Sequence, residues 1–226
     1  MDFKTGEVFA IDKPYRISSF GALAHVRYVL SRTLGCKVKI GHAGTLDPLA
    51  TGVLVLCTGK ATKRIEEFQG NSKEYTATLQ LGATTASYDR EHEVNATFPT
   101  VHISRALIAE TLPQFIGDIE QIPPTYSAVK VNGDRAYELR RAGEEVKLKP
   151  KQVHIDEIEV TDFDAEKILL SLRVVCGKGT YIRALARDLG RALGSGAYLT
   201  ALRRTRVGEF TVDKCLDYEH IREWIE

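Results

Sequence analysis

GHAGTLDPLATG, which spans residues 41–52, is the most unusual stretch of the sequence. Its three glycines permit tight turns and a close approach of other backbone. Pro48 biases Asp47 toward an extended conformation, so the Asp47 carboxylate would project from a defined loop. An Asp-Pro pair is equally typical of a helix N-cap followed by proline at the first helical position. The local sequence alone leaves both interpretations open.

The segments on either side of this stretch indicate the class of fold. The apolar run VLVLC at residues 53–57 predicts a buried strand, and the alternation of residues 75–81 predicts a half-buried one. Further strands are expected at 7–11, 153–163, 168–176 and 207–212, helices at 19–34, 60–68, 104–115, 180–193 and 220–225, and a polar loop at 84–93. These elements do not alternate strictly. The sequence therefore predicts an α+β fold, a largely antiparallel mixed sheet flanked by helices.

The composition is that of an ordinary globular protein. The chain has 226 residues, of which 43% are hydrophobic and 27% charged, and we expect one domain over residues 1–226. The four cysteines are scattered without a C-x-x-C pair, as expected of free thiols in a reducing cytoplasm. The N-terminus lacks a signal-peptide pattern, and no apolar run approaches the roughly 18 residues of a membrane span. We therefore expect a cytoplasmic protein without a membrane partner.

The net charge of +1 conceals an uneven distribution of charge. Residues 173–206 contain eight basic side chains and one acidic one, and residues 130–151 contain seven basic and four acidic ones. Concentrated basic stretches on a near-neutral chain favour a polyanionic partner. Solvated helix faces are the simpler alternative.

Two further residues are candidates for chemistry. Tyr75 begins its predicted strand, where it can serve as a packing aromatic or as a platform on which a base stacks. Arg183 falls in the first turn of a predicted helix, where the helix dipole disfavours a cation. Unless Arg183 faces solvent, this placement indicates a carboxylate partner. The histidines show no ligand spacing, so no metal site is expected.

Together these segments resemble the TruB family of pseudouridine synthases. Six blocks occur in the order of that family and cover nearly the whole chain: residues 41–54, Lys13-Pro14 with Ser18-Ser19, Lys73-Glu74-Tyr75, residues 121–130 with Gly133, Arg135 and Tyr137, residues 177–183, and residues 202–208. Any one block could arise by chance, but the ordered set is specific.

The resemblance implies that the protein isomerises the T-arm uridine of tRNA, uridine-55, to pseudouridine. Asp47 matches the catalytic aspartate, Tyr75 the tyrosine that stacks on the target base, and Arg183 the arginine that pairs with the catalytic carboxylate. The reaction joins the same uracil to ribose through a different atom, so no cofactor or metal is required. Asp47 would act as a nucleophile at C1′ or the base ring, or as a base at the ribose.

The resemblance also implies how tRNA is bound. His42 matches the histidine that helps to hold the uridine flipped out, Tyr181 and Leu202 match residues that line the pocket, and a thumb-like insertion at about 124–152 is expected to close on the RNA. The residues expected to contact RNA beyond the pocket are Lys130, Arg135, Arg140, Arg141, Arg203 and Arg204. Only about eighteen residues follow Gly208, too few for the C-terminal PUA domain of many family members.

Two other functions compete with the enzyme. One is a non-catalytic RNA-binding or tRNA-folding module on the same fold, and the other is a related synthase that modifies ribosomal RNA within a guide complex. The set of Asp47, Tyr75 and Arg183 argues against the first as the sole role, and the lack of room for an accessory domain argues against the second. We expect a monomer that needs no obligate protein partner.

Overall fold

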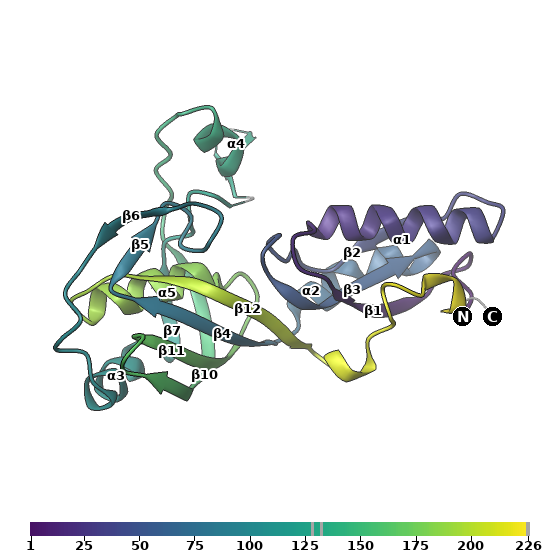
Figure 1. The fold of residues 1–226 in the computed structure, drawn as a ribbon. Coiled ribbons are helices and arrows are strands. Elements are labelled where there is room, and N and C mark those ends of the chain that lie inside the picture. The colour runs from purple at the N-terminus through teal and green to yellow at the C-terminus, as the bar shows by residue number, and fades with distance from the viewer. Residues whose placement is uncertain (128, 132, 225–226) are drawn as a thin grey trace. The chain divides into compact units, whose positions relative to one another are not determined.

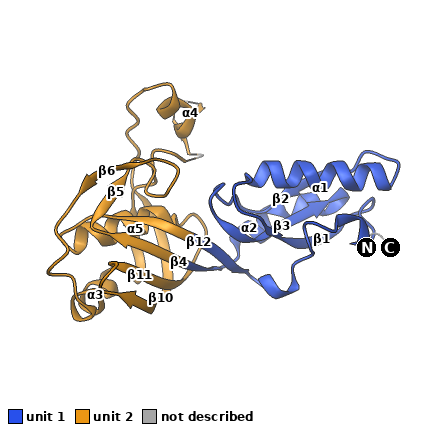
Figure 2. Ribbon diagram, viewed as in Figure 1, with its two compact units in different colours: residues 1–76, 202–226 blue, residues 77–201 orange. Residues whose placement is uncertain are grey.

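The computed structural model describes residues 1–127, 129–131 and 133–224 and consists of two compact units (Figure 2). Unit 1 comprises residues 1–76 and 202–226, and unit 2 comprises residues 77–201. The main sheet has the strand order β1 (Val8–Lys13), β3 (Thr51–Thr58), β12 (Ala197–Val207), β4 (Lys73–Leu81), β11 (Leu169–Cys176), β10 (Lys151–Asp164) and β7 (Gly117–Gln121). In addition, β2 (Ile40–His42) pairs with β3, and β13 (Phe210–Thr211) pairs with β12. Most strand pairs of this sheet are antiparallel, and the β12–β3 pair is parallel. This arrangement confirms the predicted α+β class. The single domain expected over residues 1–226 stays a prediction.

Unit 1 is built around one buried strand, β3 (Thr51–Thr58). It pairs antiparallel with β1 (Val8–Lys13) and with β2 (Ile40–His42), and parallel with the end of β12 (Ala197–Val207). The remaining elements of the unit are α1 (Ser19–Thr33), η1 (Gly59–Arg64), α2 (Ile65–Gly70), β13 (Phe210–Thr211), η3 (Val212–Lys214) and η4 (Ile221–Trp224).

Alternation along β3 divides the core of unit 1 into two clusters. Leu54 and Leu56 pack in a cluster with the buried side of α1, and Val53 and Val55 pack in a second cluster with Phe68 of α2. A strand that is buried on both sides must be apolar at every position, so the predicted buried strand at residues 53–57 is confirmed. Figure 1 shows α1 lying along one face of these strands.

Helix α1 begins where the sequence predicts. The Ser18 hydroxyl accepts a hydrogen bond from Gly21 N at 3.0 Å and so caps the helix. Ala22, Leu23, Val26 and Leu30 form its buried side at helical spacing. The opposite side of α1 therefore faces outward.

Unit 2 carries a sheet of long antiparallel strands. β10 (Lys151–Asp164) pairs with β11 (Leu169–Cys176) and with β7 (Gly117–Gln121), as expected for residues 153–163 and 168–176. The other elements are β4 (Lys73–Leu81), which begins in unit 1, and β5 (Ala83–Thr85), β6 (Val94–Thr97), α3 (Arg105–Thr111), η2 (Leu112–Phe115), β8 (Lys130–Val131), β9 (Asp134–Arg135), α4 (Ala136–Arg141) and α5 (Ile182–Ala192).

Two sequence-based expectations need correction. The strand expected at 207–212 is interrupted by a turn at Gly208, which has φ +55°: Val207 ends β12, and only the two residues of β13 continue as strand before η3. The polar loop expected at 84–93 is partly interior, since Thr85, Ser87 and Asp89 are at most 6% exposed. Residues 130–151, the basic stretch of the expected thumb, contain a short hairpin and α4.

A few predicted segments reach residues outside the described part of the chain. The helical turn expected at 220–225 is present as η4, and its last residue, Ile225, lies outside the described residues. Ala128, in one of the six family blocks, also lies outside them, as does Asn132 within the expected thumb.

Candidate active site

The loop that carries Asp47 connects β2 to β3 in unit 1. Asp47 is half-buried and precedes a tight turn over Pro48 and Leu49, in which Ala50 N donates a hydrogen bond to Asp47 O at 3.1 Å. No helix follows, so the helix-cap interpretation of the Asp-Pro pair is wrong. Aspartate at the first position and proline at the second are typical of a type I turn. The carboxylate therefore projects from a loop, as the alternative interpretation required.

The beginning of α1 fixes the position of this loop. The Ser19 hydroxyl accepts a hydrogen bond from Leu46 N at 2.7 Å and donates one to Leu46 O at 2.9 Å. Arg16 N donates to Pro48 O at 2.9 Å. The residues on both sides of Asp47 are thus hydrogen-bonded to the segment that leads into α1.

The side chain of Arg204 also fixes the position of this loop. Its side chain is 1% exposed, and its guanidinium donates to Val53 O at 2.8 Å and to Gly44 O at 3.1 Å. Gly52 makes this arrangement possible, because it has φ +105° and a Cβ there would lie 2.1 Å from Arg204 O. No other residue fits at that distance, so Gly52 allows β12 to lie directly against β3. The burial of Arg204 argues against its expected direct contact with RNA.

Lys13 is a second buried cation beside the loop. Its side chain is fully buried, and its ammonium donates to Pro14 O at 2.8 Å and to Ile17 O at 2.7 Å. Burial lowers the pKa of the Lys13 ammonium from 10.5 to about 8, and the negative charge of Asp47 opposes that shift. The sequence marked Lys13 as part of a family block and gave it no place in the site.

His42, Tyr75 and Leu202 lie in the same unit as Asp47. Burial, and secondly the charge of Arg204, lower the pKa of the half-buried His42, which favours its neutral form. Tyr75 is 8% exposed on the buried side of β4, and Leu202 is half-buried on β12. The expected contacts of these three side chains with a flipped uridine stay predictions.

Unit 2 positions Arg183 by an acidic loop that the sequence did not single out. Arg183 is the second residue of α5 and is 4% exposed. Its guanidinium donates to Ser87 O at 3.2 Å and lies 3.8 Å from the Asp89 carboxylate. Ser87 also donates to Asp89 at 2.5 Å. Asp89 is thus a carboxylate partner of the kind that a cation at a helix N-terminus requires, while the pairing of Arg183 with Asp47 stays a prediction.

Tyr181 and the expected thumb residues also belong to unit 2. Tyr181 precedes α5, and its backbone N donates to Gln121 Oε1 at 2.8 Å. Arg141 of α4 is exposed and forms an ion pair with Glu91 at 3.2 Å, and the Arg140 guanidinium lies 5.8 Å from the centre of the Tyr126 ring. The other two thumb cations expected to bind RNA are exposed on the short hairpin, Lys130 and Arg135.

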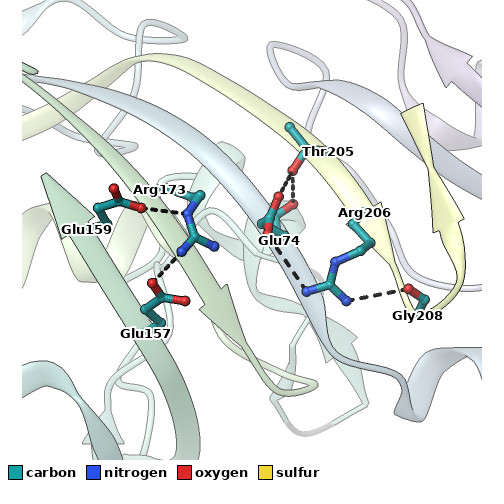
Figure 3. A network of polar contacts seen from close by, with 7 residues as sticks. All are labelled: Glu74, Glu157, Glu159, Arg173, Thr205, Arg206 and Gly208. Atoms are coloured by element: carbon teal, nitrogen blue, oxygen red, sulfur yellow. Dashed lines mark hydrogen bonds and ion pairs between the residues drawn. The ribbon is translucent and has the colours of Figure 1, made fainter. Parts of the chain in front are cut away.

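Ion pairs and burial account for most of the basic stretch at 173–206. Arg173 pairs with Glu157 and Glu159, and Arg206 lies 3.8 Å from Glu74, which also accepts a hydrogen bond from Thr205 (Figure 3). The buried arginines of the stretch are Arg183, Arg187 and Arg204. Arg203, a predicted RNA contact, is partly exposed and pairs with Asp12 at 2.6 Å. The charge count at 173–206 is therefore weak support for an RNA surface.

Among the described residues there is neither a membrane-spanning helix nor a group of metal-binding side chains. None of the helices in residues 1–127, 129–131 and 133–224 is long and apolar enough to cross a membrane. Within the same ranges, histidine, cysteine, aspartate and glutamate side chains form no group of three or more that could hold a metal ion.

Comparison with known proteins gives matches along nearly the whole chain. Residues 31–182 match the model of the TruB family pseudouridylate synthase N-terminal domain, and residues 183–226 match that of the tRNA pseudouridylate synthase B C-terminal domain. The chain is 62% identical to tRNA pseudouridine synthase B of Bacteroides thetaiotaomicron, over all of this chain and 95% of that protein. It is 50% identical to the longer protein of the same name from Dechloromonas aromatica, over 89% of this chain and 65% of that one.

A solved structure is similar over almost the entire chain. A chain of the crystal structure of a Cbf5-Nop10-Gar1 complex matches with a TM-score of 0.72 and 28% sequence identity. The match covers 99% of this chain and 56% of that one, so this chain spans about half the length of its structural relative. The expected pseudouridine synthase fold is confirmed.

The role of Arg204 in holding the loop can be tested by substitution. Arg204→Leu leaves Gly44 O and Val53 O without their donors, so we expect a loss of about 2 kcal/mol or more in the free energy of unfolding. Arg203→Leu is the matched control, because its ion pair is partly exposed and is expected to contribute less than about 1 kcal/mol. Urea unfolding of both variants measures the difference. Equal losses would contradict the role given to Arg204.

The buried Lys13 predicts how stability depends on pH. Between about pH 8 and 10.5 the unfolded chain keeps a proton on Lys13 that the folded chain has released, so Lys13 contributes a positive slope to the free energy of unfolding against pH in that window. Below pH 8 Lys13 is protonated in both states and adds no slope. Lys13→Met should remove this contribution, so the slope of the variant should be smaller than that of wild type, as measured by urea unfolding at pH 7.5 to 10.5. The same slope in wild type and variant would contradict the assignment.

Proposed function

Because the chain belongs to the TruB family of pseudouridylate synthases, we propose that it isomerises the T-arm uridine of tRNA, uridine-55, to pseudouridine. The observation that carries this proposal is the way in which the Asp47 loop is held. Hydrogen bonds from Arg16, Ser19 and Arg204 fix the backbone around Asp47, and the loop presents a half-buried carboxylate. A carboxylate fixed in this way suits catalysis that depends on orientation.

The reaction makes limited chemical demands. The bond from C1′ to N1 breaks, the uracil turns, and C5 bonds to C1′; C5 loses its proton and N1 gains one. Asp47 acts either as a nucleophile at C1′ or the base ring, or as a base at the ribose, and in each route its ionised form is required. Atoms and electrons balance within the uridine, so we assign no step to a cofactor.

The uridine must leave its stack before Asp47 can reach it, at a cost of a few kcal/mol. We assign Tyr75 to stacking on the flipped base, a contact that typically contributes roughly 1–3 kcal/mol. His42 is assigned to holding the flipped nucleotide, since its neutral ring can donate one hydrogen bond and accept another. Tyr181 and Leu202 are assigned to the pocket wall.

Arg183 is assigned to pairing with Asp47 during the reaction. The contacts of Arg183 with Ser87 and Asp89 support this assignment, because they hold a buried guanidinium in one orientation. A guanidinium carries five N–H donors in a fixed plane, so these contacts also fix the direction in which its other donors point. The protein is proposed to act in the cytoplasm, as a monomer, on tRNA.

Asp47→Asn tests the enzyme assignment. The variant keeps the size of the side chain and removes its charge, so tritium release from C5-labelled uridine in a T-arm stem-loop should fall at least a thousandfold relative to wild type. Binding of the same stem-loop should change little. Equal release from both proteins would rule out Asp47 as the catalytic group, and binding without release by wild type would favour a non-catalytic tRNA-folding module.

Combined substitution of Arg140→Ala and Arg141→Ala tests the thumb. If both arginines contact phosphates, tRNA affinity should fall and the dependence of log K on log salt should become shallower by roughly 1 to 2. Single-turnover chemistry at saturating RNA should be retained. Glu91→Gln is the control, because it removes the ion-pair partner of Arg141 and keeps both cations. An unchanged salt slope in the double variant would exclude the thumb from the RNA interface.

A further inference from the structure

The outward side of α1 carries large aromatic side chains that pack against nothing in the core. Phe20 is 66% exposed and Tyr28 is 60% exposed, whereas large aromatics usually lie mostly buried. Together with Arg32 they stand at intervals of four or eight residues, so they form one ridge along the helix. The exposed Arg27 lies two turns after Phe20 on nearly the same line along the helix, and about 100° around the helix from Tyr28. We call Phe20, Arg27, Tyr28 and Arg32 the α1 ridge.

The charged side chains of the segment that carries the α1 ridge all have one sign. Residues 13–46 contain six lysines and arginines and no aspartate or glutamate. Besides the ridge arginines, the exposed cations of this segment are Arg16, Lys37 and Lys39. Such a surface attracts a polyanion, unlike the basic stretch at 173–206, whose arginines are mostly buried or paired.

The acidic C-terminal segment lies against one flank of α1. The C-terminal segment packs on the helix through Tyr218, whose ring centre is 5.2 Å from that of His25. Asp217 and Glu219 neighbour Tyr218 in sequence, so the negative charge of this segment is on the His25 side. Arg27 stands on the other flank, at about 160° from His25 around the helix, whereas Arg32, two turns after His25, lies on the His25 flank. The ridge therefore keeps a positive field on its Arg27 side.

The arginines and aromatics of this segment also lie close to each other. The Arg32 guanidinium is 5.8 Å from the centre of the Tyr28 ring, and that of Arg16 is 5.5 Å from the centre of the Tyr15 ring. Aromatic faces interleaved with arginines are the elements with which proteins bind single-stranded nucleic acid, since bases stack on the rings and phosphates bind the cations. A surface that binds another protein would not require every charged residue of the segment 13–46 to be basic.

The α1 ridge begins at the Asp47 loop. Ser19, the first residue of α1, is hydrogen-bonded to both backbone groups of Leu46, and Arg16 is bonded to Pro48. Fifteen helical residues extend about 22 Å from there. An RNA whose target nucleotide lies at Asp47 can therefore continue directly onto the ridge.

We propose that the α1 ridge is a second RNA-binding surface, which binds phosphates and an unpaired base of the tRNA outside the flipped uridine. The proposal rests on the proposed function, because it takes tRNA as the substrate. It assigns Arg27 and Arg32 to phosphates, and Phe20 and Tyr28 to base stacking. Charge and stacking respond differently to salt, so the two assignments can be tested separately.

The test measures binding of full-length tRNA between 50 and 300 mM salt. Arg27→Ala with Arg32→Ala should weaken binding at least tenfold at 100 mM salt and make the slope of log K against log salt shallower by roughly 1.4 to 1.8. Phe20→Ala with Tyr28→Ala should weaken binding about tenfold and leave the slope unchanged. Arg27→Lys with Arg32→Lys should restore the wild-type slope.

A matched control loses the same charge elsewhere. Arg105 and Lys167 of unit 2 are exposed, and each lies within 4 Å of a carboxylate, so their joint replacement by alanine should change tRNA affinity less than twofold. Circular dichroism confirms that the variants fold. Unchanged affinity and slope in the α1 arginine variant would overturn the proposal, as would an equal loss in the control.

Failure of the proposed function gives a different result. Wild type that binds tRNA and releases no tritium would refute the isomerase activity, while the salt slopes would still decide whether RNA lies on the α1 ridge. Wild type that releases tritium, with ridge variants that bind as tightly as wild type, would refute the ridge alone.

Discussion

The buried guanidinium of Arg204 is the contact on which unit 1 most depends. It joins the end of β12 to a carbonyl of β3 and to a carbonyl of the Asp47 loop, so the loop and the strand that follows it share one side chain from a distant part of the sequence. The contact requires a glycine at position 52, because any Cβ there would overlap Arg204 O. A glycine in the middle of an otherwise β-branched and apolar run is therefore a packing requirement, although in the sequence it looks like the end of a flexible loop.

Two buried cations, Arg204 and Lys13, stand close enough to act on the charged groups of the same loop. Both are expensive to bury, and both donate hydrogen bonds to backbone carbonyls. Their positive charge acts on the surroundings, as the effect of Arg204 on the pKa of His42 and that of Asp47 on the pKa of Lys13 indicate. A field of this sign suits a site that must attract a phosphodiester.

Elements with a clear hydrophobic period could be predicted from the sequence. The buried strand at 53–57, the alternation at 75–81 and the capped helix α1 appear at nearly the predicted positions, because burial alone determines their pattern. β12 was missed because its polar half, residues 202–206, is rich in arginine, and those arginines are satisfied by groups far away in sequence. Asp89 was missed for the same reason, since its burial depends on Arg183. Counting charges could not distinguish paired arginines from available ones.

The Ser19 hydroxyl both donates to and accepts from Leu46, so one side chain does for that residue what a neighbouring strand would do. The loop is thereby held as rigidly as an edge strand of a sheet, although no further strand pairs with it. Little disorder then remains to be lost when substrate arrives, and the free energy of association can go toward extracting the nucleotide from its stack. The effect of this rigidity would therefore appear in the rate of the reaction and not in the structure of the free enzyme.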